Sequence, residues 1–246
     1  MYYLSPNAKV GENTKIGYYS IIEDGVIIGK NCSIGHHVII KQGTIIEDNV
    51  EIADGTIIGK LPQKSANSKT TQIENNLICK ISPNVRIGSN SIIYAGATIE
   101  EKVFIADLVT IRENVIIGKG TIVGRGVCIE NKCKIGENCK LESNAYITAF
   151  SDVEDFAFIA PGVITSNDNY VGRDPERVKH FKGVIVKKGG RIGANATILP
   201  GKIIEEDTLI AAGSVVTKDT KPRKIYLGNP AKEYKDVPEK QLLENQ

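Results

Sequence analysis

The sequence predicts an all-β solenoid, in which short parallel strands wind into stacked triangular coils. An apolar residue recurs every six positions along most of the 246 residues. A small or β-branched residue stands four positions after each of these, and polar pairs such as Glu-Asn and Lys-Asn separate the repeats. The composition has no Trp, one Met and 24 Gly, and its abundance of Ile and Val favours strand over helix.

The six-residue period fits neither a helix nor a flat sheet, whose periods are about 3.6 and two residues. Because six is a multiple of the strand period, the recurring residue and the one four positions later point inward. The apolar period covers residues 10–58, 81–159 and 186–216. Three hexapeptides make one coil, and a coil can bury its apolar side only by stacking on its neighbours.

Two segments interrupt the period. Residues 61–79 are polar and rich in turn formers, so we expect them to loop out of the coil. Residues 165–183 form the second interruption, which is polar as far as His180. Long loops in a compact array are more often functional than accidental, so we expect the second loop to contribute to an active site.

The period ends after Val216. Asp236 can serve as the N-cap of a short helix, with Pro238 just inside its first turn. We therefore expect residues 1–232 to form the solenoid domain. Residues 233–246 are expected to form a short helical cap on its open end.

Charge and composition exclude several classes of protein. A net charge of +2 argues against nucleic-acid binding as a main role. No apolar run approaches the ~18 residues of a membrane-spanning helix, and residues 1–6 lack the features of a secretory signal. We expect a cytoplasmic protein that does not bind membranes.

The five cysteines are predicted to be free and structural. They show no C-x-x-C spacing, and no histidines accompany them. Cys32, Cys133 and Cys139 fall on the small-residue position of the repeat, where a thiol packs as a small hydrophobe. No metal site is expected.

Residues 18 apart in the sequence should stack in columns about 4.8 Å apart, because one coil contains three repeats. One column consists of Tyr94, Arg112, Glu130, Thr148 and Ser166 and leads into the second loop. Another consists of Asn90, Leu108, Gly126, Asn144 and Gly162. It predicts that Asn144 lies near the root of the second loop. The alternating charges of Arg112 and Glu130 are equally compatible with surface ion pairing of little energetic value.

The repeat pattern resembles that of the left-handed parallel β-helix, and this resemblance covers nearly the whole chain. Residues 210–219 (IAAGSVVTKD) and 228–232 (GNPAK) closely resemble the acyl-CoA-dependent hexapeptide acyltransferases. The resemblance implies a left-handed coil, a coenzyme A site and a homotrimer. It implies that Ala194 and Ala212 meet the pantetheine arm, that Thr217 and Lys218 meet the nucleotide end, and that Lys232 lies near the phosphates. Arg223 and Lys224 add positive charge to this coenzyme A region. Small residues permit close backbone approach and basic residues attract phosphates, although the lysines could instead form a solvated edge.

The second loop favours an amine as the acceptor. In the O-acetyltransferases of this family, a catalytic His follows the Thr that ends the coil before the loop. Asn167 and Asp168 stand there in this sequence. An amine is nucleophilic once neutral and needs a weaker base than a hydroxyl group does. Residues 142–148 and 165–170 also resemble the N-acetyltransferases that act on nucleotide-linked amino sugars.

We therefore predict the transfer of acetyl from acetyl-CoA to the amine of a dTDP- or UDP-linked amino-deoxy sugar, for surface polysaccharide synthesis. Asn144 would donate a hydrogen bond near the amine or the developing oxyanion. Asp168 would orient or deprotonate the ammonium, and His180 is a second candidate for the base. The predicted substrate-binding residues are Glu142, Asn167, Arg112, Glu130 and Arg173. Alternatively, Asn144 is an ordinary turn residue and Asp168 an ordinary loop carboxylate.

Other functions remain open at this point. A sugar O-acetyltransferase would share the fold and the acyl donor. A non-catalytic solenoid is a further alternative, because fold alone does not determine function. A carbonic-anhydrase-like protein would need three metal-binding histidines, whereas two of the three here are adjacent and the third is distant.

Overall fold

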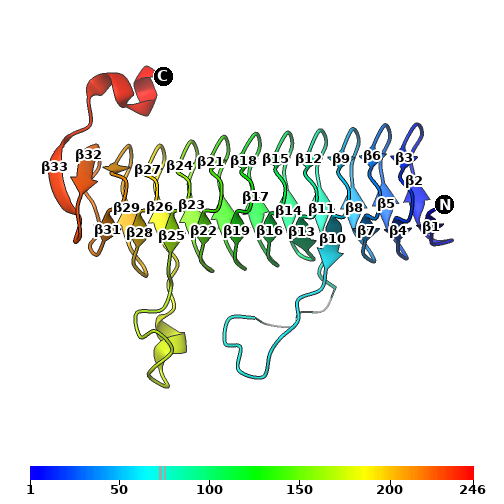
Figure 1. The fold of residues 1–246 in the computed structure, drawn as a ribbon, viewed down its shortest axis with the longest axis horizontal. Coiled ribbons are helices and arrows are strands. Elements are labelled where there is room, and N and C mark those ends of the chain that lie inside the picture. Colours follow the sequence, from blue (N-terminus) through cyan, green and yellow to red (C-terminus); the bar gives the residue numbers. More distant parts are fainter. Residues whose placement is uncertain (72–73, 75) are drawn as a thin grey trace.

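The computed structural model describes residues 1–71, 74 and 76–246, and it shows a parallel β-solenoid of three sheets (Figure 1). Sheet A contains β1 (Tyr3–Leu4), β4 (Ile21–Ile22), β7 (Ile39–Ile40), β10 (Ile57–Lys60), β13 (Ile92–Tyr94), β16 (Thr110–Ile111), β19 (Cys128–Ile129), β22 (Tyr146–Ile147), β25 (Ile164–Thr165), β28 (Thr197–Ile198) and β31 (Val215–Val216). Sheet B contains β2 (Lys9–Val10), β5 (Ile27–Ile28), β8 (Ile45–Ile46), β11 (Lys80–Ile81), β14 (Thr98–Ile99), β17 (Ile116–Ile117), β20 (Lys134–Ile135), β23 (Asp152–Val153), β26 (Ile185–Val186) and β29 (Ile203–Ile204). Sheet C contains β3 (Lys15–Ile16), β6 (Ser33–Ile34), β9 (Glu51–Ile52), β12 (Arg86–Ile87), β15 (Phe104–Ile105), β18 (Ile122–Val123), β21 (Lys140–Leu141), β24 (Phe158–Ile159), β27 (Arg191–Ile192), β30 (Leu209–Ile210), β32 (Lys224–Leu227) and β33 (Lys232–Asp236).

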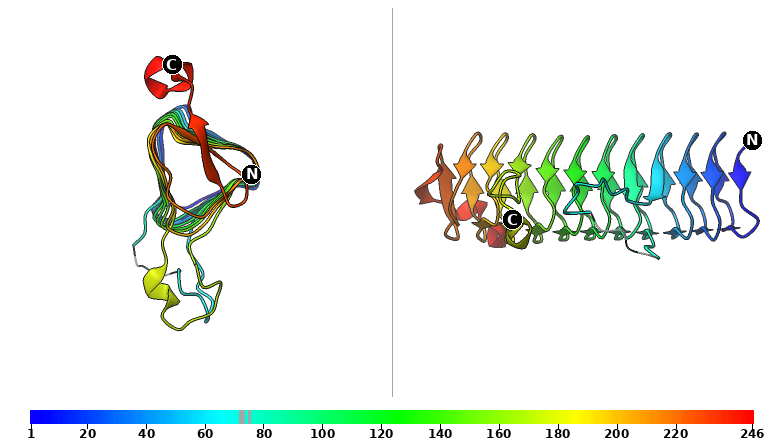
Figure 2. Two further views of the ribbon diagram at one scale, coloured as in Figure 1. Left: turned by 90° about the vertical axis from the view of Figure 1, so that its left-hand side faces the viewer. Right: turned by 90° about the horizontal axis from the view of Figure 1, so that it is seen from below.

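Each coil as far as β30 contributes one strand to each sheet, the last coil contributes β31 and β32, and the coils form a triangular prism (Figure 2). Ile111 pairs with Ile129, and Ile129 with Ile147, so stacked residues are 18 positions apart, as the period predicts. The stacking continues past both interruptions, where Ile58 pairs with Ile93 and Ile164 with Thr197. The predicted left-handed parallel β-helix of hexapeptide repeats is thus confirmed.

The recurring apolar residues fill the interior of the prism. Ile58, Ile111 and Ile147 are 0% exposed, whereas Val10 and Ile16 in the first coil are only partly buried. The five cysteines are free, and all except Cys128 are buried. Burial raises the pKa of Cys79 and of Cys133 to about 12, so these thiols are unreactive packing groups.

Both interruptions leave the solenoid as loops at the same edge, the A–B corner, where sheet A strands turn toward sheet B. We call residues 61–79 loop 1 and residues 166–184 loop 2. Loop 1 joins β10 to β11, and loop 2 joins β25 to β26. The two loops project from the same side of the prism (Figures 1 and 2). Loop 2 contains one 3-10 turn, η1 (Arg177–His180).

Gly183 returns loop 2 to the solenoid at a point of close backbone approach. A Cβ atom there would lie 2.2 Å from the carbonyl carbon of Phe150 and 2.3 Å from the amide nitrogen of Ser151. We expect Gly183→Ala to destabilise the fold by about 1–3 kcal/mol, because the backbone must move to admit a methyl group. Thermal unfolding measures this loss. Gly172→Asn is the control, because a Cβ at that left-handed position meets nothing within 4 Å. Equal melting temperatures for the two variants would contradict the expectation.

The C-terminal segment differs in part from the prediction. The short helix is present as two 3-10 turns, η2 (Glu239–Gln241) and η3 (Leu243–Asn245). The preceding residues form an antiparallel hairpin of β32 and β33, which the sequence did not predict. The hairpin pairs with the free edge of β30 through β32, so the backbone groups at that edge form hydrogen bonds. The 3-10 turns lie outside the triangle, where Leu243 donates its amide to Asp207, so they do not cover the open end (Figure 2).

Candidate active site

The predicted site residues lie along the two edges of sheet A. One edge is the A–B corner with its two loops. The other is the C–A corner, where sheet C strands turn toward sheet A. Asn144 lies at the C–A corner, just before β22, whereas loop 2 leaves after β25 at the A–B corner. Residues 144–148 cross the width of the sheet, which is roughly 13 Å. The prediction that Asn144 lies near the root of loop 2 is therefore wrong within one chain.

Asn144 adopts the left-handed conformation that turns the chain at the C–A corner. Its φ is 61°, and its amide nitrogen donates to the carbonyl oxygen of Arg125 at 2.9 Å. Asn90 and Asn195 adopt the same conformation at this corner. Asparagine tolerates positive φ, so the turn alone accounts for the residue type. The residue is nevertheless exposed, and its side chain lies on the surface beside β22.

The C–A corner changes character along the solenoid. The residues that occupy the position equivalent to Ala212 in successive coils are Tyr18, His36, Asp54, Ser89, Asp107, Arg125, Ser143, Pro161, Ala194 and Ala212. The position accepts large side chains in the early coils, so packing does not require alanine. A Cβ at the neighbouring Gly213 would also meet nothing within 4 Å. The last coils therefore present an open strip at this corner, where packing does not require alanine and the left-handed φ of 69° favours glycine at Gly213.

The other predicted coenzyme A residues divide between corners. Ala231 donates its amide to the Val215 oxygen at 2.8 Å, which holds the turn before Lys232 beside the Ala212 coil. Thr217 and Lys218 follow β31 at the A–B corner, across sheet A from Ala212. Arg223 lies at the third corner, between sheets B and C, and pairs with Glu244 at 3.1 Å. The predicted grouping of Arg223 with the other coenzyme A residues is therefore wrong within one chain.

Asp168 braces loop 2 from within. One carboxylate oxygen accepts the Tyr170 amide at 2.9 Å, and the other accepts the Gly172 amide at 3.0 Å and the Arg177 guanidinium at 2.5 Å. Partial desolvation would raise the pKa of Asp168, but the two amides and Arg177 outweigh it and lower the pKa. The carboxylate is thus charged at neutral pH. Its oxygens accept hydrogen bonds from groups within loop 2.

The other predicted loop residues are more accessible. His180 ends η1 and is exposed, with its ring 5.8 Å from that of Tyr170. Arg173 is exposed near the tip. Asn167 helps to line a cavity of about 560 Å³ between loop 2 and residues 199–200. The sequence did not predict this apolar floor, which Leu199 and Pro200 supply because they follow β28 directly above Ser166.

Arg112 is the centre of a polar cluster at the A–B corner. Its Nε lies 2.8 Å from Glu113, its Nη1 3.4 Å from Glu130 and its Nη2 3.3 Å from the Thr71 hydroxyl. The guanidinium carbon also lies 4.9 Å from the centre of the Tyr94 ring. The predicted stacking of Tyr94, Arg112 and Glu130 is confirmed, and the sequence missed Glu113.

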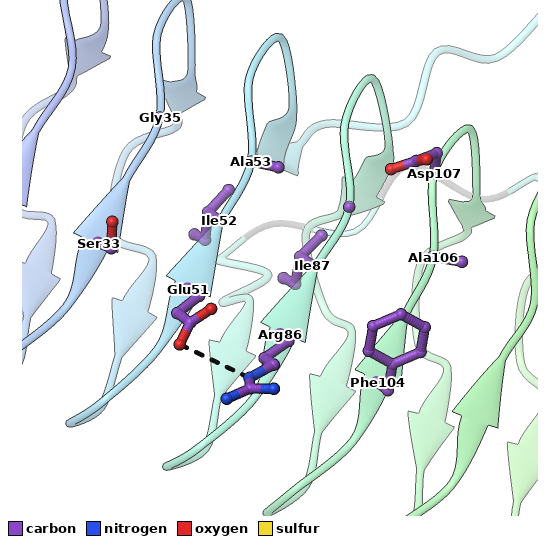
Figure 3. A pocket seen from close by; sticks show the side chains of 11 residues that line it. Ser33, Gly35, Glu51, Ile52, Ala53, Arg86, Ile87, Phe104, Ala106 and Asp107 are labelled. Carbon is purple, nitrogen blue, oxygen red and sulfur yellow. Dashed lines mark ion pairs between the residues drawn. The ribbon is translucent and has the colours of Figure 1, made fainter.

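A second groove lies on sheet C (Figure 3). The two loops leave at the A–B corner, which sheet C does not border. Its volume is about 420 Å³, and its walls include Phe104 and a Glu51–Arg86 ion pair of 3.6 Å. Both charged side chains of that pair are more than half exposed. The groove contains none of the predicted site residues.

Within the described residues, no group of three His, Cys, Asp or Glu side chains is placed to hold a metal ion. In the same part of the chain, no helix has the length and apolar character needed to cross a membrane.

Family models and known proteins agree with this architecture. The model described as bacterial transferase hexapeptide (six repeats) matches residues 7–42 and 96–131. The model described as hexapeptide repeat of succinyl-transferase matches residues 25–60, 80–106 and 183–218. The chain belongs to the hexapeptide-repeat family.

Similar curated proteins match only part of the chain. A dTDP-3-amino-3,6-dideoxy-alpha-D-galactopyranose 3-N-acetyltransferase of Aneurinibacillus thermoaerophilus is 50% identical over 52 residues, which are 21% of this chain and 27% of that protein. A probable macrolide acetyltransferase of Lysinibacillus sphaericus is 48% identical over 53 residues, or 21% of this chain and 29% of that protein. The matches thus span less than a third of either relative.

Solved structures share the fold over nearly the whole chain. An Arabidopsis UDP-N-acetylglucosamine acyltransferase is 16% identical with a TM-score of 0.65, covering 96% of this chain and 73% of that one. The enzyme from Campylobacter jejuni is 17% identical with a TM-score of 0.59, covering 95% and 72%. These likenesses support the solenoid fold.

Proposed function

We propose that this protein is an acyl-CoA-dependent N-acyltransferase that acetylates the amino group of a nucleotide-linked amino-deoxy sugar. The observation that carries the proposal is the strip of small residues at the C–A corner, around the partly exposed Ala194 and the exposed Ala212 and Gly213. The amides of a pantetheine arm can approach backbone groups there, and packing does not require alanine at positions 194 and 212. The similarity to an amino-sugar N-acetyltransferase supports the acceptor class.

The two edges of sheet A supply complementary parts, and we propose that they meet between copies of the chain. Asn144, Glu142 and the small-residue strip lie at the C–A corner, whereas Asp168 and His180 belong to loop 2 at the opposite edge. Loop 2 of one copy, placed against the C–A corner of the next, would complete the site. A homotrimer of cyclic symmetry repeats this contact three times.

The reaction proposed is direct attack of the neutral amine on the thioester. A nitrogen–carbon bond forms, the carbon–sulfur bond breaks, and the sulfur leaves as the coenzyme A thiolate. The proton released from nitrogen passes to a base and then to the thiolate. Asn144 would donate a hydrogen bond to the oxyanion or accept one from the amine. The exposed imidazole of His180 suits the role of base better than Asp168, whose pKa is lowered and whose oxygens already accept three hydrogen bonds.

The variant Asp168→Asn tests whether Asp168 stabilises the conformation of loop 2 or acts as the catalytic base. The pKa of Asp168 is lowered, so the carboxylate is charged throughout the range above its ordinary value of about 4. Its stabilising contacts are therefore present at neutral pH and are lost only as the pH falls through the lowered value. We expect the variant to reduce kcat about tenfold or more by releasing loop 2, with no shift of the pH profile between pH 6 and 9.

The control for this variant is Asp174→Asn in the same loop, where one carboxylate oxygen accepts the Glu176 amide. It should leave kcat nearly unchanged. If Asp168→Asn shifts the pH profile of kcat between pH 6 and 9, Asp168 itself accepts the proton.

Release of free coenzyme A thiol tests the proposed function. Acetyl-CoA would be offered with a panel of dTDP- and UDP-linked 3-amino and 4-amino sugars, and with the matching hydroxyl sugars. Thiol release with an amino sugar alone supports N-acylation, and release with the hydroxyl sugars would instead support an O-acetyltransferase. No release with any acceptor would contradict acyl transfer. Buried free thiols fit a reducing compartment, so we propose a cytoplasmic location.

A further inference from the structure

Arg112 was predicted to bind substrate, but its guanidinium group already forms hydrogen bonds with other residues of the protein. Two of its nitrogens engage both oxygens of Glu113, at 2.8 and 3.1 Å. The Glu113 side chain is 2% exposed and that of Arg112 is 19% exposed, so the carboxylate is buried and the guanidinium partly so. Burial by itself would lower the pKa of Arg112, but the contacts with Glu113 and the charge of Glu130 outweigh it and raise the pKa. The Arg112 guanidinium is therefore permanently charged, and its forked donors are directed at neighbouring residues of the protein.

The remaining contacts of the cluster attach loop 1 to the A–B corner. Arg112 donates to the Thr71 hydroxyl, and the Asn131 side chain donates to the Thr70 carbonyl oxygen at 3.0 Å. Asn114 donates to the carboxylate of Glu74 at 3.2 Å. Thr70, Thr71 and Glu74, which we call the docked segment, thus lie against coils that are distant in sequence. Asn131 is 1% exposed, so the corner beneath this segment is buried.

Glu130 has acceptor capacity left on the side away from Arg112. Its Oε2 faces Arg112, whereas among the residues that the structure describes its Oε1 receives only the weak Cys128 thiol at 3.8 Å. Tyr146 lies one coil above Cys128 on the same outer face of sheet A. Burial, with the nearby charge of Glu130, raises the pKa of Tyr146 to about 12 and that of Cys128 to about 11. This face therefore offers the acceptor oxygen of Glu130 beside the phenol donor of Tyr146.

We infer that Arg112 is a positioning residue. It orients Glu130 and holds the docked segment, so that Glu130 and Tyr146 present a donor–acceptor pair to the hydroxyl- and amine-bearing part of the acceptor. The inference rests on the proposed function for its acceptor. The column from Arg112 to Ser166 contains three coil steps, or about 14 Å. This span, bounded by the docked segment and loop 2, suits an elongated nucleotide-linked sugar lying along the A–B corner.

The test compares Arg112→Lys, which keeps the charge but loses the fork, with the double variant R112M/E113Q. The double variant avoids leaving Glu113 buried without a partner. Arg86→Ala is the matched control, because Arg86 forms an exposed column pair with Glu51 on sheet C. Hydrogen exchange by mass spectrometry is measured on the peptides around residues 61–71. The KM of acetyl-CoA and of the accepted amino-sugar nucleotide is measured separately.

We expect both Arg112 variants to exchange faster in loop 1 and to raise the acceptor KM about tenfold or more. The KM of acetyl-CoA should stay within about twofold, and Arg86→Ala should match wild type. Unchanged exchange would overturn the attachment of loop 1 by Arg112. Faster exchange with an unchanged acceptor KM would overturn the role in acceptor binding. If no amino sugar is acetylated by wild type, the proposed function and its acceptor fail, while the exchange result still decides whether Arg112 holds the loop.

Discussion

Two inactive variants of this chain are expected to restore each other's activity when they assemble together. The first is Asn144→Ala, which alters the C–A corner. The second is Asp168→Ala, which frees the Tyr170 and Gly172 amides and Arg177 in loop 2. Each variant alone should lose about 100-fold or more in kcat, since each removes one part of every site.

Mixed assemblies contain some sites with both native parts. If loop 2 of one copy completes the C–A corner of the next, a ring of three copies with both variants has one intact site. Activity should therefore return to about one third of wild type. Two affinity tags allow mixed assemblies to be purified before the assay.

The control is a mixture of Asn144→Ala with Asn144→Asp, which cannot regenerate a native C–A corner. It should stay inactive. Absence of recovery in the Asn144→Ala and Asp168→Ala mixture, with mixed assembly demonstrated, would contradict a site shared between copies.

Ala212→Tyr is expected to block coenzyme A without disturbing the fold. Ala212 is exposed, and earlier coils already carry Tyr18 and Arg125 at the equivalent position. A tyrosine there should cover the backbone strip beside Gly213. We expect the KM of acetyl-CoA to rise about 100-fold, which corresponds to about 2.7 kcal/mol, with the melting temperature nearly unchanged.

Ser89→Tyr is the matched control, because Ser89 occupies the same corner position six coils earlier. Its kinetics should match those of wild type. An unchanged KM for acetyl-CoA in Ala212→Tyr would contradict the placement of the pantetheine arm at the C–A corner.

The fold was predictable because the period fixes both the burial and the stacking. Each recurring Ile or Val must point inward, and a spacing of 18 sets the register, so pairs such as Ile111 and Ile129 follow directly. The loops were predictable because polar segments that break the period cannot enter a dry core. The C-terminal hairpin was not, since β33 (Lys232–Asp236) is stabilised by pairing with β32 rather than by an apolar pattern.

The site was harder to predict because a column gives the height along the solenoid but not the side chains' tertiary partners. Asn144 and loop 2 are close in height, yet the width of sheet A separates them. Arg112 stacks under Glu130 as expected, but its strongest partner is its neighbour Glu113, which turns inward at the corner. Arg112 also contacts Thr71 of loop 1, which is 41 positions away in the sequence. The six-residue period cannot predict such a contact, because loop 1 lies outside it.

The most direct test of N-acyl transfer is the structure of the product. Wild-type protein, acetyl-CoA and the amino-sugar panel would be incubated together, and each nucleotide sugar analysed by mass spectrometry and NMR. The proposed function predicts a mass gain of one acetyl group, located on the amine nitrogen, with one free coenzyme A per product. An acetyl group on a sugar oxygen, or unmodified sugars throughout the panel, would contradict it.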